Sequence, residues 1–225
     1  MKNYLRSHRY LRELVVVVIF NIFFSGFLYS PNPEAEVWAV FGVFTILLAM
    51  VTVPSVFLLE KGNARAFLLV RPRGRFYFLL AKMLQAVVID FVVLATFSLL
   101  YGIRYAELGY FAALPLRWLA LLLILLLTVS FLTLTFTCRS WMSMVALLWI
   151  VFGSILNKAA LFPPAGFSEL YKIIAFLLPP NLELIYSAIE LKLFGWRLLF
   201  IFSGLLQLFF LIWLNYRCFL KKDLV

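Results

Sequence analysis

The sequence predicts an all-α integral membrane protein with six transmembrane helices in a single domain over residues 1–225. Hydrophobic residues make up 65% of the chain and charged residues only 13%, and the mean hydropathy is +1.05. A soluble globule of this composition would lack polar side chains to cover its surface. A net charge of +10 could indicate nucleic acid, but the basic residues lie between apolar runs, as in membrane topology signals. We therefore expect a lipid bilayer and no nucleic acid as partner.

Six apolar runs approach the roughly 20 residues that a spanning helix needs. They cover about residues 14–29, 37–59, 79–101, 116–137, 141–156 and 196–216. The first run is similar to a signal-peptide core, but the bulky "GFLYSP" follows it where a small-residue cleavage site would stand, so we expect it to be retained. The preceding "KNYLRSHRYLRE" predicts an N-terminal amphipathic helix along the membrane interface.

The connection before the last run predicts a re-entrant segment over residues 159–194. It contains "LYKIIAFLLPPNLELIYSAIELKLFG", which indicates two short apolar helices broken at Pro179 and Pro180, with Asn181 as the N-cap of the second. Each helix is too short to cross about 30 Å of hydrocarbon. We expect the pair to dip into the outer leaflet and return, the alternative being a loop that rests on the headgroups.

The distribution of Lys and Arg predicts the orientation. If the N-terminus is cytoplasmic, fourteen of the 20 basic residues lie on the cytoplasmic side: Lys2, Arg6, Arg9, Arg12, Lys61, Arg65, Arg71, Arg73, Arg75, Lys82, Arg139, Arg217, Lys221 and Lys222. The positive-inside rule then places both termini in the cytoplasm. We expect the plasma membrane of a prokaryote, which is the inner membrane in a Gram-negative cell.

The cytoplasmic loop over residues 60–78 carries a recognisable pattern. Leu68 and Leu69 precede Pro72 by four and three residues, and Arg75 and Lys82 follow it by three and ten. This resembles the coupling loop of type-2 ABC exporter permeases, which runs Glu, Gly-Thr-Leu-Glu, Leu-Leu, Pro, Arg and Lys before the third span. Upstream, the counterparts are Glu60 and Gly62, but Gly62 lies one position further from the proline, and "NARA" replaces Thr-Leu-Glu.

The resemblance implies a permease subunit that pairs with a second permease chain and with two ATPase subunits, which bind ATP and Mg. The loop's own residues fit that role, because a short helix over residues 63–70, ended before Pro72, would present Phe67 and Leu68 beside Arg71. Such an apolar knob ringed by charge can dock in a groove on a soluble partner. The alternative is that the arginines only anchor the loop to anionic lipid and fix the topology.

One carboxylate is predicted inside the spans. Asp90 lies eight residues after Lys82, about 12 Å further along a helix. An intramembrane carboxylate normally faces the bundle interior or water. Asp90 could line a substrate path, but we favour a structural role, with Gln85, a neighbouring hydroxyl or Arg139 as its partner. The neutral Asn21 and Gln207 are expected to be helix-packing contacts.

The chain shows no enzyme motif. It lacks a phosphate-binding G-x-x-x-x-G-K-[ST], and its one histidine, His8, lies in the basic N-terminal segment. We therefore expect no catalytic, cofactor or metal site in this chain. The function that the resemblance to ABC exporter permeases implies is export, driven by ATP, of a substrate that we expect to be amphipathic or lipid-like. The alternatives are a permease similar to the haem exporter of cytochrome c maturation and a non-transporting membrane assembly protein.

Overall fold

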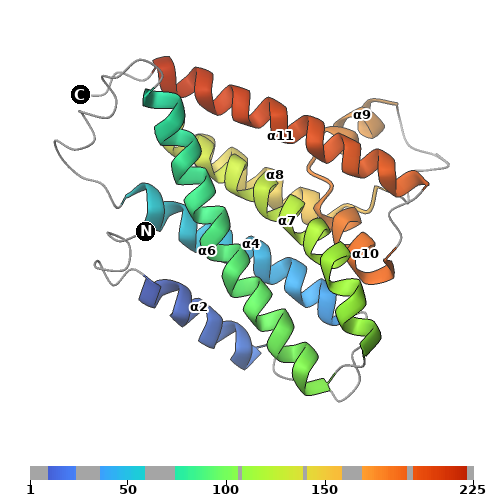
Figure 1. Cartoon of the computed structure of the whole chain (residues 1–225). Helices are drawn as coiled ribbons and strands as arrows, with labels where there is room; N and C mark the ends of the chain where they lie inside the picture. The colour runs from blue at the N-terminus through green and yellow to red at the C-terminus, as the bar shows by residue number, and fades with distance from the viewer. Residues whose placement is uncertain are drawn as a thin grey trace.

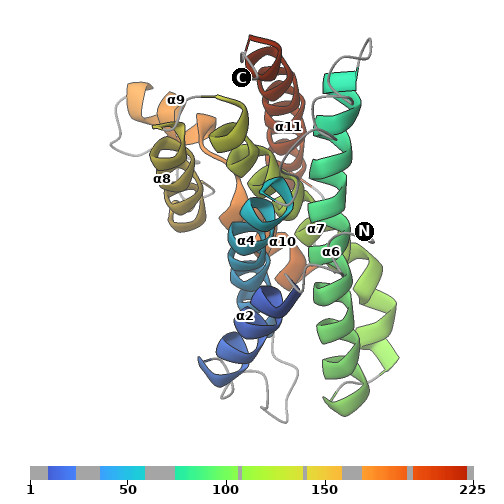
Figure 2. The same ribbon diagram turned by 90° about the vertical axis from the view of Figure 1, so that its left-hand side faces the viewer.

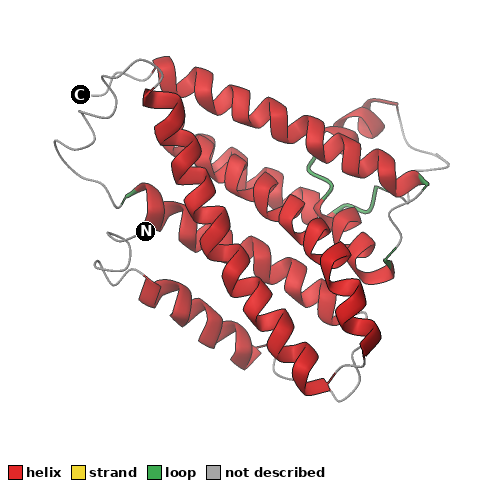
Figure 3. Ribbon diagram, viewed as in Figure 1, coloured by secondary structure: helices red, strands yellow, loops and turns green. Residues whose placement is uncertain are grey.

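The computed structural model describes residues 10–23, 36–58, 74–105, 108–138, 141–158, 169–191 and 195–221. Within these ranges the chain forms only α-helices and no strand (Figure 3). The helices are α2 (Tyr10–Phe23), α4 (Glu36–Phe57), α6 (Gly74–Tyr105), α7 (Leu108–Thr137), α8 (Met142–Ile155), α9 (Glu169–Leu177), α10 (Asn181–Glu190) and α11 (Trp196–Lys221). The predicted all-α class is confirmed for the part of the chain that the structure describes.

Four of these helices are long and apolar enough to cross a membrane. The spans are Val37–Phe57, Gly74–Arg104, Gly109–Thr137 and Arg197–Lys221. Such helices make the chain a membrane-embedded protein. The apolar α8 has 14 residues, which gives about 21 Å at 1.5 Å per residue, less than the hydrocarbon thickness. The described part of the first run, α2, also has 14 residues.

Helix α7 lies at the centre of the bundle. It contacts α4, α6, α8, α10 and α11, and its middle residues are buried almost without interruption. Helix α4 packs on one side of it, and α2 packs against α4 (Figures 1 and 2). Phe20 of α2 stacks on Phe44 of α4, with ring centroids 4.1 Å apart. The core is therefore built around two helices, α4 and α7.

The beginning of α6 and the ends of α4 and α11 lie together at one end of the bundle (Figure 1). Arg75 Nη1 donates a hydrogen bond to the Leu220 carbonyl oxygen of α11 at 2.7 Å. Lys82 Nζ donates to the Val56 carbonyl oxygen of α4 at 3.2 Å. Both cations sit where helix C-termini present unpaired carbonyl groups. Helices α9 and α10 lie toward the other end of the bundle (Figure 1), and α10 contacts α11.

Candidate functional site: a broken helix pair beside a membrane cavity

The break between α9 and α10 occurs at the two prolines that the sequence indicated. Because proline has no N–H and clashes with the preceding turn, one helix cannot run through this point. Asn181 is not the N-cap of α10, so that prediction was wrong: Pro180 is the capping residue, and its carbonyl accepts from the Leu184 N–H at 3.0 Å. The Asn181 amide instead donates to Ser154 Oγ of α8 at 3.5 Å.

Helix α10 lies inside the bundle, in contact with α4, α7, α8 and α11. Glycines on the surrounding helices make room for it. A Cβ on Gly153 of α8 would come within 2.6 Å of the Pro179 carbonyl oxygen, and a Cβ on Gly42 of α4 within 2.5 Å of Ile185 Cγ1. A Cβ on Gly204 of α11 would lie 3.3 Å from Pro180 Cγ. Close backbone approach at small residues is a usual means of helix packing in membranes.

Two polar side chains complete the hydrogen bonding at the end of α9. Lys158, which is 1% exposed, donates to the Leu178 carbonyl oxygen and, at 3.4 Å, to that of Phe176. Gln207 Nε2 of α11 donates to the same two oxygens, at 3.1 Å and 3.4 Å. Backbone groups released by a broken helix need such partners away from water, so these two residues stabilise the break.

Burial lowers the pKa of Lys158 to about 8, although the negative charge of Glu183 on α10 acts in the opposite direction. Glu183 is itself 2% exposed. Taking an ammonium out of water favours its neutral form. The lysine next to the break therefore loses its proton more easily than a lysine in water.

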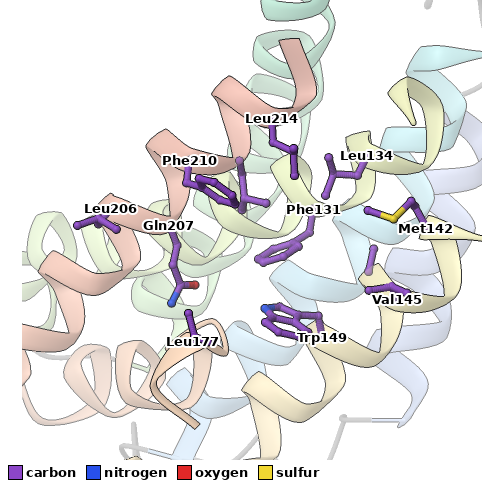
Figure 4. Close-up of a pocket in the computed structure, with 12 residues that line it drawn as sticks. Phe131, Leu134, Met142, Val145, Trp149, Leu177, Leu206, Gln207, Phe210 and Leu214 are labelled. Atoms are coloured by element: carbon purple, nitrogen blue, oxygen red, sulfur yellow. The ribbon is translucent and has the colours of Figure 1, made fainter. Parts of the chain in front are cut away.

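A cavity of about 420 Å³ adjoins the end of α9. It lies between α8 and α11, with α7 as its floor (Figure 4). Its lining residues are Phe131, Leu134, Met142, Val145, Ala146, Trp149, Leu177, Leu206, Gln207, Phe210, Leu211 and Leu214. A second apolar cavity of about 670 Å³ lies between α8 and α9. Val145 and Trp149 of α8 line both cavities.

The structure gives Asp90 a hydroxyl partner. Its carboxylate is 1% exposed on α6, and Oδ1 accepts a hydrogen bond from Thr52 Oγ1 of α4 at 2.6 Å. Gln85 lies on the same helix, but five positions correspond to a rotation of about 140°. The predicted pair of Asp90 and Gln85 therefore does not share one helix face, and the carboxylate contributes to the contact between α4 and α6.

Two of the predicted coupling residues can be placed. Arg75 is half-buried, and Lys82 is only 4% exposed, with its ammonium 5.6 Å from the centre of the Phe78 ring. Lys82 is thus enclosed by its own chain. The other residues predicted for coupling lie outside the described residues: Glu60, Gly62, Phe67, Leu68, Leu69, Arg71 and Pro72.

Sequence reasoning did not single out Lys158 and treated Gln207 only as a packing residue. A lysine directly after an apolar run is most simply interpreted as an interfacial residue. Its contact with α9 joins residues twenty positions apart in the sequence, so no local pattern shows it. The combination of a double proline with a glutamine inside the following span could have indicated this contact. A helix broken by proline leaves backbone carbonyl groups without a partner, and a side-chain amide can donate to them.

Comparison of the chain with protein-family models, with curated proteins and with solved structures found no match.

Proposed function

We propose that this chain is the transmembrane permease subunit of an ATP-driven ABC exporter. It would act as a dimer with a second permease chain, together with two ATPase subunits that bind ATP and Mg. The observation that carries the proposal is the register of Leu68, Leu69, Pro72, Arg75 and Lys82 in a basic loop between two apolar spans. This register is that of the coupling loop in type-2 ABC exporter permeases.

The contacts of Arg75 and Lys82 support a mechanical role for the helix that follows the loop. Through these two residues the first turns of α6 are hydrogen-bonded to the ends of α11 and α4. Hydrogen bonds from charged donors are stronger than neutral ones. A displacement of the loop by closing ATPase subunits would therefore move three helix ends together. This is the coupling that alternating access requires.

The proposal includes a topology of six spans. Helices α2 and α8 would be the two further spans beside the four longer ones, each lengthened by neighbouring residues of the chain. The α9–α10 pair would enter the outer leaflet and return. The basic N-terminal segment would lie along the inner surface. Both termini would be in the cytoplasm, and the membrane would be a prokaryotic plasma membrane, the inner membrane in a Gram-negative cell.

The substrate class that we propose is amphipathic or lipid-like. The cavities beside α8 are lined almost entirely by aliphatic and aromatic side chains. Apolar pockets with few polar groups suit greasy ligands.

Co-purification tests the proposal. The tagged chain would be extracted in mild detergent from the membranes of its own organism, and co-purifying proteins would be searched for an ATPase with a phosphate-binding loop. We expect such an ATPase with the wild-type chain and its loss from the variant Phe67→Ala/Leu68→Ala, because the apolar knob would be missing. ATP hydrolysis by the purified complex is the second measurement.

The matched control is Leu198→Ala/Phe202→Ala on α11, which truncates the same residue types at side chains that are 54% and 63% exposed. The control should keep the ATPase. If the wild-type chain carries no ATPase, the exporter proposal is wrong. If the loop variant keeps the ATPase and its activity, the loop is only a topological anchor.

A further inference from the structure

The side-chain oxygen of Gln207 is a buried acceptor without a hydrogen-bond partner among the residues that the structure describes. Two carbonyl oxygens, those of Phe176 and Leu178, face the other end of this amide and fix the NH₂ group toward them. The oxygen, Oε1, is thereby directed away from α9. It is buried and accepts no hydrogen bond from the residues that the structure describes. Figure 4 shows the amide at the edge of the cavity, between Leu177 and Phe210.

The position of Gln207 in its span makes an unpaired acceptor destabilising. It lies eleven residues after the beginning of α11 at Trp196, which is about 16 Å along the helix and near the middle of a hydrocarbon layer about 30 Å thick. A buried polar atom without a hydrogen bond is destabilising. The acyl chain of a bilayer lipid has no donor at this depth, since its polar groups lie at the interface. An ordinary lipid chain in the cavity would leave Oε1 unpaired.

A donor of the protein faces the same cavity. Trp149 of α8 lines it, and its indole ring lies opposite Gln207 in Figure 4. The indole N–H can only donate, and the Gln207 oxygen can only accept. A hydroxyl group can satisfy both, because it donates one hydrogen bond and accepts others. The rest of the lining is apolar, so the matching molecule is apolar apart from that hydroxyl.

The size of the space suits such a molecule. A volume of about 420 Å³ falls within the range of small-molecule sites, about 300–1,000 Å³. The second cavity, between α8 and α9, shares the lining residues Val145 and Trp149 with the first.

We propose that the cavity between α8 and α11 is the cargo site, and that the cargo is a lipid-like molecule whose hydroxyl group donates a hydrogen bond to Gln207 Oε1. This inference rests on the proposed function and specifies its substrate. A hydroxyl near the middle of the membrane belongs to a molecule in transit, because a resident lipid keeps its polar groups at the interface. The end of α9 would sense the cargo, since the Gln207 amide joins it to the cavity.

Photolabelling of the isolated full-length chain tests the site. The probes are a long-chain alcohol with a diazirine in its chain and the methyl ether of the same alcohol, which cannot donate. In lipid nanodiscs the alcohol should label the cavity-lining peptides that contain Phe131, Trp149 and Phe210 several-fold more than the ether does. The variant Gln207→Leu should reduce labelling by the alcohol to the level of the ether and leave labelling by the ether unchanged.

A second pair of variants keeps the test valid if Gln207→Leu disturbs the end of α9. Val145→Trp fills the cavity, whereas Leu147→Trp places the same side chain on a part of α8 that lines neither cavity and is 41% exposed. Labelling by the alcohol should be lost in the first variant and kept in the second.

Equal labelling by alcohol and ether in the wild-type chain would overturn the proposal and show that bulk lipid or water fills the cavity. Retained labelling in Val145→Trp would overturn it as well. Neither result depends on an ATPase. A failed co-purification removes the exporter proposal, whereas failed labelling removes only this site.

Discussion

Helices α4 and α7 differ from α6 and α11 in burial but hardly in composition. In an apolar window of 18 residues from each helix, the mean hydropathy is 2.3 and 2.6 for α4 and α7, and 2.2 and 2.1 for α6 and α11. Yet 72% of each window is buried in α4 and α7, against 39% in α6 and 33% in α11. Lipid tails are as apolar as a protein core, so hydropathy alone does not say which helix is central. The difference separates a packed scaffold, α4 and α7, from a wall, α6 and α11, whose outer sides are exposed.

The two groups of helices are also held differently. The scaffold is held by aromatic and aliphatic packing, as between Phe57 of α4 and Phe136 of α7, whose stacked rings have centroids 5.0 Å apart. Helix α11 also packs closely against α7 and adds polar contacts to that packing: Asn215 Nδ2 donates to the Ser130 carbonyl oxygen at 2.9 Å, and Thr137 Oγ1 donates to Asn215 Oδ1 at 2.8 Å. Interhelical hydrogen bonds of this kind contribute modestly in membranes. The cavity lies on the α11 side of α7.

The largest expected effect compares one phenylalanine from each group. Phe44 of α4 is fully buried, whereas Phe209 of α11 is 75% exposed. Phe44→Ala should lower the free energy of unfolding by about 3–5 kcal/mol, because it leaves a cavity. Phe209→Ala should change it by less than about 0.5 kcal/mol, since detergent or lipid replaces the lost contacts. Unfolding by SDS titration measures both. Similar losses in the two variants would contradict the division into scaffold and wall.

An intermediate effect is expected where the broken helix pair meets α8. Gly153→Ala should destabilise the protein by about 1–3 kcal/mol, because the new Cβ would come within 2.6 Å of the Pro179 carbonyl oxygen, a backbone atom. Gly109→Ala is the control, since a Cβ there meets nothing within 4 Å. The control should be neutral or gain up to about 1 kcal/mol from helix propensity. Thermal unfolding in detergent distinguishes them, and a tolerated Gly153→Ala would mean that the contact at Pro179 is loose.

The smallest expected effect concerns pH. Because burial lowers the pKa of Lys158 from 10.5 to about 8, the folded chain binds fewer protons than the unfolded chain between these values. Stability should therefore rise as the pH increases above 8, by about 1 kcal/mol over the first pH unit. Lys158→Met should remove this increment, although it also removes the hydrogen bonds to the end of α9. Thermal unfolding at pH 7.5 and 9 measures it. The same pH dependence in both proteins would show that Lys158 is not the group responsible.

The positions of the helices were largely predictable. The runs at 37–59 and 141–156 correspond closely to α4 and α8, and the double proline marked the break between α9 and α10. Helix α6 begins five residues before the predicted run, at Gly74, and Arg75 in this additional turn donates to a carbonyl oxygen of α11. A hydropathy window ends at charged residues, while a helix continues wherever those charges are satisfied.

The sequence by itself determined that this protein is helical and embedded in a membrane, and where its helices break. Both follow from local rules, since a bilayer requires internally hydrogen-bonded apolar segments and proline ends a helix. Only the tertiary structure decided that α7 is central, that Pro179 packs directly against Gly153, and that Gln207 faces a cavity beside the end of α9. These are contacts between residues far apart in a chain of nearly uniform hydropathy, where shape and hydrogen bonding, and not apolarity, select the neighbours.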